Sequence, residues 1–186
     1  MNRGTPIGGL TLVHQDGAQA LAVAHELGGL YAEVYRGTPQ ETDPFYSAAR
    51  FAERLPGYAR APGFRLVVAR EGGALVGYAF GYRLPAGSRW WEGLVDPVPD
   101  GFTEESGHRT FALCELHVRA DWRGKGLASR LHAELLKVDA ERATVLVRQD
   151  NPALNIYTHW GYEQVGRLQP YADSPVFAAL VLLMRP

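Results

Sequence analysis

Cysteine and long apolar runs are nearly absent from this sequence, and each absence excludes a class of protein. Cys114 is the single cysteine, so the chain cannot form an internal disulfide. The longest apolar run, Val176 to Met184, is too short to span a bilayer. The first residues show no basic segment followed by an apolar block, which argues against a signal peptide. We therefore expect a cytoplasmic protein that does not enter a membrane.

The sequence also lacks an excess of either charge. It carries 19 Lys and Arg residues against 20 Asp and Glu residues, a formal net charge of −1. A nucleic-acid-binding protein would show a basic excess, and a disordered chain would contain few apolar residues, whereas 46% of these residues are hydrophobic. With 186 residues and no internal repeat, we expect one compact domain over residues 1–186 and no nucleic-acid partner.

Hydrophobic periodicity and turn residues predict an alternation of strands and helices. The predicted strands lie at residues 9–13, 64–70, 74–84, 109–119, 143–147, 162–168 and 176–184. The predicted helices lie at residues 18–34, 44–55, 127–139 and 154–160. Asp43 is expected to cap the second helix with Pro44 in its first position, and Pro56 and Gly57 to stop it. Residues 71–73 are expected to form a hairpin turn.

The glycine-rich segment Arg123-Gly124-Lys125-Gly126-Leu127-Ala128 lies between a predicted strand and a predicted helix. Glycine lets the backbone turn tightly and bring its N–H groups close to a ligand. The first N–H groups of a helix have no intrahelical partner and lie at the positive end of the helix dipole. Because Arg123 and Lys125 add positive charge, this segment is a candidate site for a phosphate or pyrophosphate.

Two common phosphate-binding patterns do not fit the segment. A P-loop needs Ser or Thr after Gly-Lys to reach a magnesium ion, and here Gly124-Lys125 is followed by Gly126. A dinucleotide fingerprint needs a glycine three residues after Gly126, where the sequence has Ser129. Nucleotide triphosphatases and dinucleotide-dependent enzymes are therefore disfavoured.

The segment instead matches the pattern Arg/Gln-x-x-Gly-x-Gly/Ala at Arg123, Gly126 and Ala128, and here the chain resembles the Gcn5-related N-acetyltransferase (GNAT) superfamily. The stretch from Asn151 to Tyr162 resembles a second signature of that family, and the similarity covers roughly residues 64–186. The resemblance implies an α/β (α+β) fold with a mixed, mostly antiparallel sheet of about seven strands flanked by about four helices. It also implies a splay between strands four and five.

The resemblance further implies acetyl coenzyme A (acetyl-CoA) as co-substrate. Its pyrophosphate would be held by the glycine-rich loop and the start of the next helix, at Arg123, Gly124, Lys125, Gly126, Leu127, Ala128 and Ser129. Its pantetheine arm and thioester carbonyl would meet the backbone of strand four, at Leu116, His117 and Val118. Asn151 matches an asparagine that contacts the coenzyme arm, although its spacing to Tyr157 is one residue shorter than in the commonest form, and Asn155 is the substitute.

Acetyl transfer to an amine needs a base, because an aliphatic ammonium with a pKa of about 10 has no lone pair with which to attack. Strand alternation places Glu115 and His117 on one face of the predicted fourth strand. Glu115 is the first candidate for the base, since many family members carry a carboxylate at this distance before the loop arginine. The alternative is a structural carboxylate paired with an arginine such as Arg109, and His117 and His108 are weaker candidates for the base.

Tyr157 is expected to act at the departing sulfur. It lies four residues before Gly161, as in the family, and a phenol within hydrogen-bond reach can protonate a thiolate whose conjugate thiol has a pKa of about 8.5. The alternative is a helix tyrosine that only packs on the sheet. Cys114 alternates onto the apolar face of its strand and is expected to be buried. The histidines show no metal-ligand spacing, so no metal is expected.

The acceptor is the part of the reaction that the sequence leaves open. The resembling family places its acceptor between the first two helices and the connection that joins strands three and four. Here that connection is acidic and aromatic, with Trp90, Trp91, Glu92, Asp96, Asp100, Glu104 and Glu105. Such a lining suits a cationic amine, but the loop could equally be a solvated flap. We expect a small-molecule primary amine rather than a protein lysine or N-terminus. The rival is a non-catalytic acyl-CoA-binding module, and a homodimer stays open.

Overall fold

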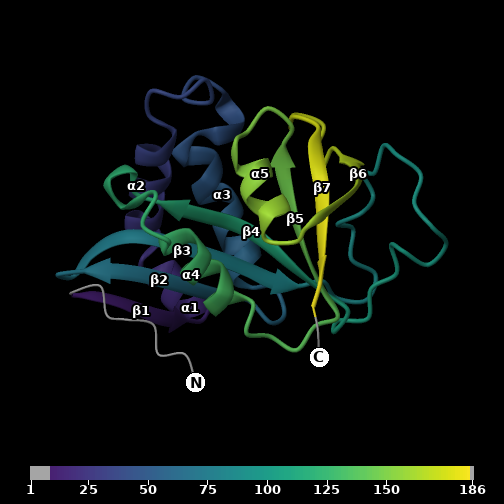
Figure 1. The fold of residues 1–186 in the computed structure, drawn as a ribbon, viewed down its shortest axis with the longest axis horizontal. Coiled ribbons are helices and arrows are strands. Elements are labelled where there is room, and N and C mark those ends of the chain that lie inside the picture. The colour runs from purple at the N-terminus through teal and green to yellow at the C-terminus, as the bar shows by residue number, and fades with distance from the viewer. Residues whose placement is uncertain (1–8, 185–186) are drawn as a thin grey trace. The chain divides into compact units, whose positions relative to one another are not determined.

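The computed structural model describes residues 9–184 (Figure 1). The strands form a seven-stranded sheet in the order β1-β2-β3-β4-β5-β7-β6, mostly antiparallel but with β4 and β5 parallel, which confirms the predicted fold class. The chain divides into two compact units, one containing the chain up to Gly81 with Glu115–Lys137 and the other Tyr82–Cys114 with the chain from Val138. The single domain over residues 1–186 extends beyond the described residues at both ends and stays a prediction.

The first unit contains an antiparallel meander. Its strands are β1 (Leu10–Gln15), β2 (Arg65–Glu71) and β3 (Ala74–Arg83), of which β3 continues for two residues into the second unit. Gly72 and Gly73 join β2 to β3 with φ of +54° and +87°. Two successive residues with positive φ match the right-handed twist of the strands that they join. The predicted hairpin is therefore confirmed.

The predicted helix over residues 18–34 is wrong in one respect, because the structure divides it into α1 (Gly17–Ala22) and α2 (Ala24–Tyr35). The two helices meet at Val23, whose φ of −105° and ψ of +15° leave the helical region. The side chain of Asp16 accepts a hydrogen bond from the Gln19 N–H and starts α1. The buried positions keep helical spacing on both sides of Val23, so periodicity cannot detect this break.

The next predicted helix begins later and ends later than expected. Asp43 caps a single 3-10 turn, η1 (Pro44–Tyr46), and Ser47 then caps α3 (Ala48–Ala59). Pro56 lies inside α3 and does not stop it. A proline inside a helix removes one backbone hydrogen bond. The helix persists because Phe51 and Leu55 on its inner face are fully buried.

Helix α4 (Leu127–Leu135) follows the glycine-rich segment and is shorter than the predicted helix over residues 127–139. Its buried residues are Leu127, Leu131, His132 and Leu135. The chain leaves the helix at Leu136, and the carbonyl oxygen of Lys137 accepts a hydrogen bond of 2.6 Å from the guanidinium of Arg65 on β2. This tertiary contact holds the chain just after the end of the helix.

The second unit contains the start of β4 (Thr110–Val118) and the three strands β5 (Arg142–Arg148), β6 (Glu163–Leu168) and β7 (Phe177–Leu183). Its helix is α5 (Ala153–His159). β7 pairs antiparallel with β5 and with β6. The parallel register of β4 and β5 runs from Thr110 opposite Arg142 to Leu113 opposite Val145, and so covers only the first part of β4. The predicted splay between strands four and five stays a prediction. Within residues 9–184, no helix is long and apolar enough to cross a membrane.

Candidate functional site

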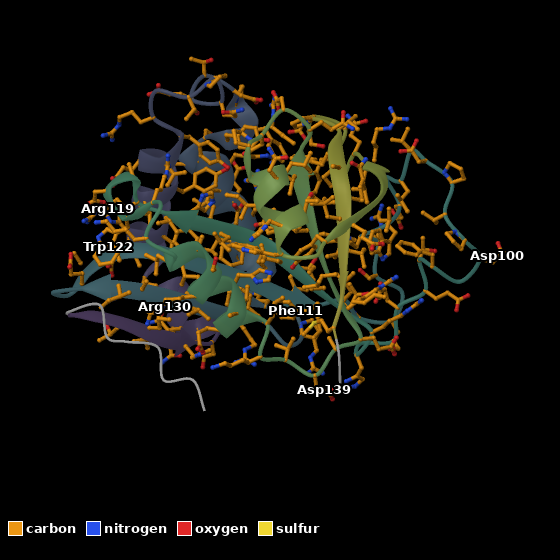
Figure 2. The ribbon with its side chains drawn as sticks, in the orientation of Figure 1. Asp100, Phe111, Arg119, Trp122, Arg130 and Asp139 are labelled. Carbon is orange, nitrogen blue, oxygen red and sulfur yellow. The ribbon has the colours of Figure 1, made fainter. Side chains whose placement is uncertain are left out.

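The glycine-rich loop of the first unit follows a short 3-10 turn, η2 (Ala120–Trp122). Gly124 and Gly126 both have left-handed backbone conformations, with φ of +71° and +76°. Residues with a Cβ adopt this conformation at a cost, so the loop path depends on its glycines. Trp122 is buried, and the Lys125 ammonium lies 5.2 Å from the centre of its indole ring. Figure 2 labels Arg119 and Trp122 on the segment that leads into the loop.

The N-terminus of α4 opens directly from this loop. Gly126 occupies the N-cap position, and no side chain caps the helix. The first backbone hydrogen bond of the helix runs from the Arg130 N–H to the Gly126 carbonyl oxygen, so the preceding N–H groups have no carbonyl one turn earlier in the helix. A Cβ built at Gly124 or Gly126 would meet no atom within 4 Å. The backbone N–H groups and the positive end of the helix dipole therefore face open space, an arrangement that suits a phosphate.

Two contacts connect the loop and α4 to the strands of the same unit. The Arg123 Nε donates a hydrogen bond of 3.3 Å to the Val118 carbonyl oxygen at the end of β4. Gly77 of β3 lies beneath α4, where a Cβ would stand 3.1 Å from a methyl carbon of Leu131. Because Gly77 has no side chain, α4 can approach β3 closely. The end of β4 and the start of α4 are thus held together.

Glu115 and His117 lie on the same face of β4, as strand alternation predicted. The Glu115 Oε2 is 2.8 Å from the His117 Nε2, and the Glu115 Oε1 is 4.0 Å from an Nη of Arg54 on α3. All three side chains are nearly buried, with exposed fractions of 14%, 7% and 9%. The arginine beside Glu115 is therefore Arg54, and the suggestion of Arg109 is wrong, because strand position alone cannot show which helix covers a strand.

Three tyrosines surround the His117 imidazole. Tyr31 and Tyr35 of α2 and Tyr78 of β3 have ring centres 5.3, 5.7 and 5.3 Å from it, with their planes steeply inclined to the imidazole. Burial raises the pKa of each tyrosine, and the charge of Glu115 raises it further. The phenols therefore stay neutral at physiological pH. The sequence predicts neither these three tyrosines nor Arg54 as neighbours of His117, and the one usable signal in it is the one-turn spacing of Tyr31 and Tyr35.

Tyr157 and Asn151 belong to the second unit. Tyr157 is a buried residue of α5, and its ring centre lies 5.4 Å from that of Trp160 and 5.3 Å from that of Tyr162, both edge-on. The Asn151 Oδ1 accepts a hydrogen bond of 2.9 Å from the Ala153 N–H and thereby stabilises the start of α5. Asn155 is exposed on the same helix. The structure thus groups the predicted residues within each unit: the loop, Glu115 and His117 in the first, and Tyr157 and Asn151 in the second.

The remaining candidates have local partners. The His108 Nδ1 is 2.9 Å from an Nη of Arg83, at an exposed position in the second unit. Cys114 is only partly buried, and its thiol lies 3.6 Å from the Ala112 carbonyl oxygen. Among residues 9–184, no three His, Cys, Asp or Glu side chains form a group that could hold a metal ion.

The acidic connection between β3 and β4 folds onto the sheet of its own unit. Trp91 is buried, and a carboxylate oxygen of the buried Glu105 accepts hydrogen bonds from its indole N–H at 2.8 Å and from Arg142 at 3.0 Å. Asp96 forms an ion pair of 2.7 Å with Arg167 of β6. These contacts use the acidic side chains within the unit, as expected of a flap that packs on the sheet.

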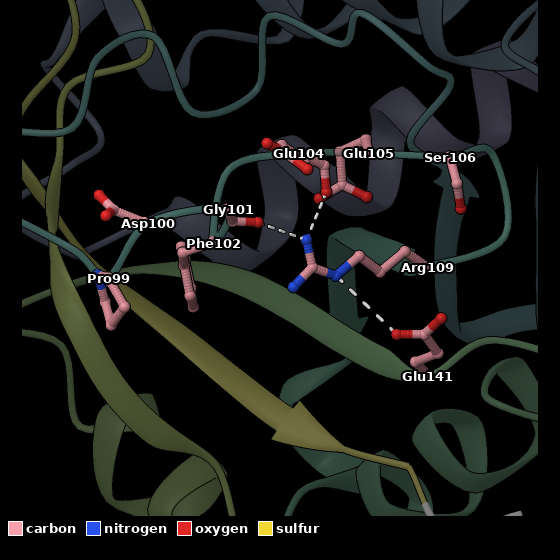
Figure 3. Close-up of a pocket in the computed structure, with 9 residues that line it drawn as sticks. All are labelled: Pro99, Asp100, Gly101, Phe102, Glu104, Glu105, Ser106, Arg109 and Glu141. Carbon is pink, nitrogen blue, oxygen red and sulfur yellow. Dashed lines mark hydrogen bonds and ion pairs between the residues drawn. The ribbon is translucent and has the colours of Figure 1, made fainter.

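The same connection lines an open pocket of about 630 Å³ (Figure 3). The Arg109 guanidinium extends across the pocket and donates hydrogen bonds of 2.6 and 2.7 Å to the carbonyl oxygens of Gly101 and Glu104. Glu141 lies on the other side of the guanidinium, at 3.8 Å. The positive charge of Arg109 thus faces the carboxylate of Glu141 and two carbonyl oxygens. Neither the glycine-rich loop nor Tyr157 lines this pocket.

Known proteins share this architecture. The model of the acetyltransferase (GNAT) family matches residues 25–162, and no curated protein matches the chain. An acetyltransferase of the GNAT family from Streptococcus pneumoniae is 14% identical, with a TM-score of 0.59 and coverage of 95% of this chain and 99% of that chain. The PaiA N-acetyltransferase from Thermoplasma acidophilum in complex with coenzyme A is 10% identical, with a TM-score of 0.57 and coverage of 94% and 99%. A spermidine N-acetyltransferase chimera from Vibrio cholerae and hSSAT is 15% identical, with a TM-score of 0.57 and coverage of 95% and 96%. These similarities show the fold, and because the family model spans well over half of the residues, the chain belongs to the GNAT acetyltransferase family.

Proposed function

We propose that this protein is an N-acetyltransferase that transfers the acetyl group of acetyl-CoA to a primary amine. The observation that carries the proposal is the left-handed Gly126 at the uncapped start of α4. A pyrophosphate needs several backbone donors, positive charge and space, and the loop offers all three. The membership of the chain in the GNAT family agrees with this use of the loop.

The residues assigned to acetyl-CoA are those of the loop and the neighbouring strand. Arg123 to Ser129 would hold the pyrophosphate, and the backbone of Leu116, His117 and Val118 would hold the pantetheine arm and the thioester carbonyl. Asn151 would contact the arm through its amide nitrogen, because its oxygen already bonds the Ala153 N–H. When bound, acetyl-CoA supplies an acetyl group activated as a thioester.

The protein's own groups would move the protons of the reaction. The Glu115–His117 pair would take a proton from the acceptor ammonium and leave the amine able to attack directly in a ternary complex. A backbone N–H at the end of β4 would stabilise the negative charge that develops on the carbonyl oxygen, a contribution of about 3 kcal/mol for donors of this type. Tyr157 would protonate the departing sulfur. No covalent acyl-protein stage is required.

A small cationic amine is the acceptor that we favour. Negative charge and aromatic rings attract ammonium groups, and the carboxylate of Glu115 lies near the rings of Tyr31 and Tyr35, with Arg54 offsetting part of its charge. The fold similarity to a spermidine N-acetyltransferase agrees with this choice. Protein lysines and N-termini are the alternative acceptors, and a non-catalytic acyl-CoA-binding module is the alternative function.

A coenzyme-release screen tests the proposal. The purified protein is given acetyl-CoA with spermidine, with kanamycin, or with peptides that present one lysine or one free N-terminus. Turnover with spermidine or kanamycin is the expected result, and faster turnover with a peptide would reassign the acceptor class. Tight binding of acetyl-CoA without release of coenzyme A in any reaction would contradict the enzymatic function and favour the binding module.

A further inference from the structure

Both oxygens of the Glu115 carboxylate already face partners. Oε2 lies 2.8 Å from the His117 ring, and Oε1 faces the Arg54 guanidinium at 4.0 Å. Arg54 is itself held in place, since it donates hydrogen bonds to the Phe45 carbonyl oxygen at 3.0 Å and to the Tyr31 hydroxyl at 3.3 Å. A carboxylate engaged on both sides is well placed to orient a neighbour. It is badly placed to collect a proton from a substrate directly.

The contact with Glu115 determines which nitrogen of His117 carries the proton. An ionised carboxylate only accepts hydrogen bonds, so Nε2 is the donor and the neutral ring keeps its lone pair on Nδ1. Nδ1 makes no hydrogen bond with any residue in the described part of the chain. The contact with Glu115 thus selects the tautomer of the imidazole ring, and in that tautomer the lone pair of Nδ1 is not used in a hydrogen bond.

The rings around His117 restrict its orientation. Tyr31, Tyr35 and Tyr78 contact the imidazole from α2 and β3, while Glu115 holds it from its own strand. The titratable and charged groups that face it are these three phenols, Glu115 and, behind Glu115, Arg54. Since the raised pKa values keep the phenols neutral, none of the three tyrosines can serve as a base near neutral pH.

His117 also lies beside the candidate acetyl-CoA loop. The next residue, Val118, accepts the hydrogen bond from Arg123 at the start of that loop. The Arg119 N–H then donates to the Val76 carbonyl oxygen on β3, which holds the end of β4 in the sheet. A base at this position would be carried on the same rigid element as the backbone donors assigned to the thioester.

We propose that His117 is the catalytic base for the acceptor amine and that Glu115 is its positioning residue. This inference rests on the proposed function. One proton of the acceptor ammonium passes to Nδ1 of His117 and later to water. The freed nitrogen lone pair forms the N–C bond as the C–S bond breaks. The sulfur receives a proton from Tyr157, which regains one through water from the acylated nitrogen. The Glu115 carboxylate stabilises the imidazolium that forms in the first step.

The two roles predict different effects in His117→Gln and Glu115→Gln. The rates are measured between about pH 5.5 and 9.5, the range in which histidine and simple amines titrate, with the amine that the protein acetylates fastest. We expect His117→Gln to lower kcat by about 10²- to 10⁴-fold and to remove the acidic limb of the pH profile. We expect Glu115→Gln to lower kcat less and to keep the limb, displaced to lower pH, because a neutral amide stabilises the imidazolium less well. Glu53→Gln, an exposed carboxylate on α3, is the matched control.

The opposite pattern would overturn the inference. If Glu115→Gln removed the acidic limb while His117→Gln kept it, Glu115 would be the base. If both variants kept the wild-type profile, neither would be. A wild-type protein that acetylates no amine would instead contradict the proposed function. Calorimetry with acetyl-CoA separates these cases from misfolding, since folded variants should keep the wild-type Kd within about twofold, a difference below about 0.5 kcal/mol.

Nuclear magnetic resonance of the imidazole nitrogens needs no acceptor amine, and its main readout comes from the wild-type protein. In protein labelled with ¹⁵N-histidine, neutral His117 should carry its proton on Nε2, and Glu115→Gln should alter the tautomer ratio. Its titration midpoint should coincide with the acidic limb of the rate profile. A neutral ring protonated on Nδ1 would overturn the assignment, because that nitrogen would then have no lone pair to offer.

Discussion

Gly77 and His117 approach each other so closely that a side chain at Gly77 would touch the backbone of β4. A Cβ there would lie 3.0 Å from the His117 carbonyl oxygen, in addition to its contact with Leu131 of α4. The same glycine thus allows β3 to lie against both the strand that carries His117 and the helix that follows the candidate acetyl-CoA loop.

Gly77→Ala is therefore expected to destabilise the protein. Inserting a methyl group into a packed site costs about 1–3 kcal/mol, because backbone atoms must shift to admit it. Urea unfolding followed by fluorescence measures the difference. Gly57→Ala is the control, since Gly57 lies in α3 with nothing within 4 Å of an added Cβ, and alanine favours a helix there. Equal stability of Gly77→Ala and wild type would contradict the importance of this close approach.

Gly126→Asp and Gly126→Asn together test the phosphate site. Aspartate and asparagine have nearly the same shape, and both tolerate left-handed backbone better than most residues. Only aspartate places negative charge in the open space above the loop. We expect Gly126→Asp to weaken acetyl-CoA binding at least about tenfold more than Gly126→Asn, or about 1.4 kcal/mol, by calorimetry. The loop would lose its assignment if both folded variants bound acetyl-CoA as the wild type does.

Tyr157→Phe tests the protonation of the departing sulfur. The substitution removes one hydroxyl and leaves the ring contacts with Trp160 and Tyr162 in place. We expect the single-turnover rate to fall by about 10²- to 10⁴-fold, the usual contribution of a general acid, with the Kd for acetyl-CoA unchanged. Tyr171→Phe, at an exposed tyrosine of the same unit, should leave the rate unchanged. A rate for Tyr157→Phe within about twofold of wild type would make Tyr157 a packing residue.

His132 is expected to make the stability of the protein sensitive to acid. Burial in α4 lowers the pKa of its imidazole from 6.5 to about 4. Above pH 6.5 the residue is neutral in the folded and unfolded states alike. As the pH falls from 6.5 towards 4, the unfolded state binds a proton that the folded state does not, so stability declines and then levels off below the folded pKa.

Urea unfolding of His132→Gln and of wild type between about pH 7 and pH 4 measures how much His132 contributes to the loss of stability in acid. The variant lacks the titrating group, so its stability should fall less over the interval. His25→Gln removes an exposed histidine and controls for the loss of a titratable side chain. Parallel stability curves for His132→Gln and wild type would show that His132 does not contribute to acid sensitivity.

Features that depend on neighbouring residues were predictable from the sequence. The turn at Gly72 and Gly73 and the left-handed loop at Gly124 and Gly126 follow from the backbone freedom of glycine, and the strand alternation that places Glu115 beside His117 follows from backbone geometry. The fold class, a mixed and mostly antiparallel sheet of about seven strands, came from the family resemblance, and the structure confirms it. The break at Val23, the passage of α3 through Pro56 and the early end of α4 were not predictable, because burial and distant contacts decide them.

The sequence by itself indicated the glycine-rich loop as the candidate phosphate site and determined which side chains share a face of β4. The tertiary structure alone decided the surroundings of Glu115 and His117. Arg54 of α3, Tyr31 and Tyr35 of α2 and Tyr78 of β3 come from three separate elements, and no local pattern links them to β4. The physical reason is that the protonation and orientation of a buried group depend on every charge, donor and ring packed around it, and packing brings those groups together from positions far apart in the chain.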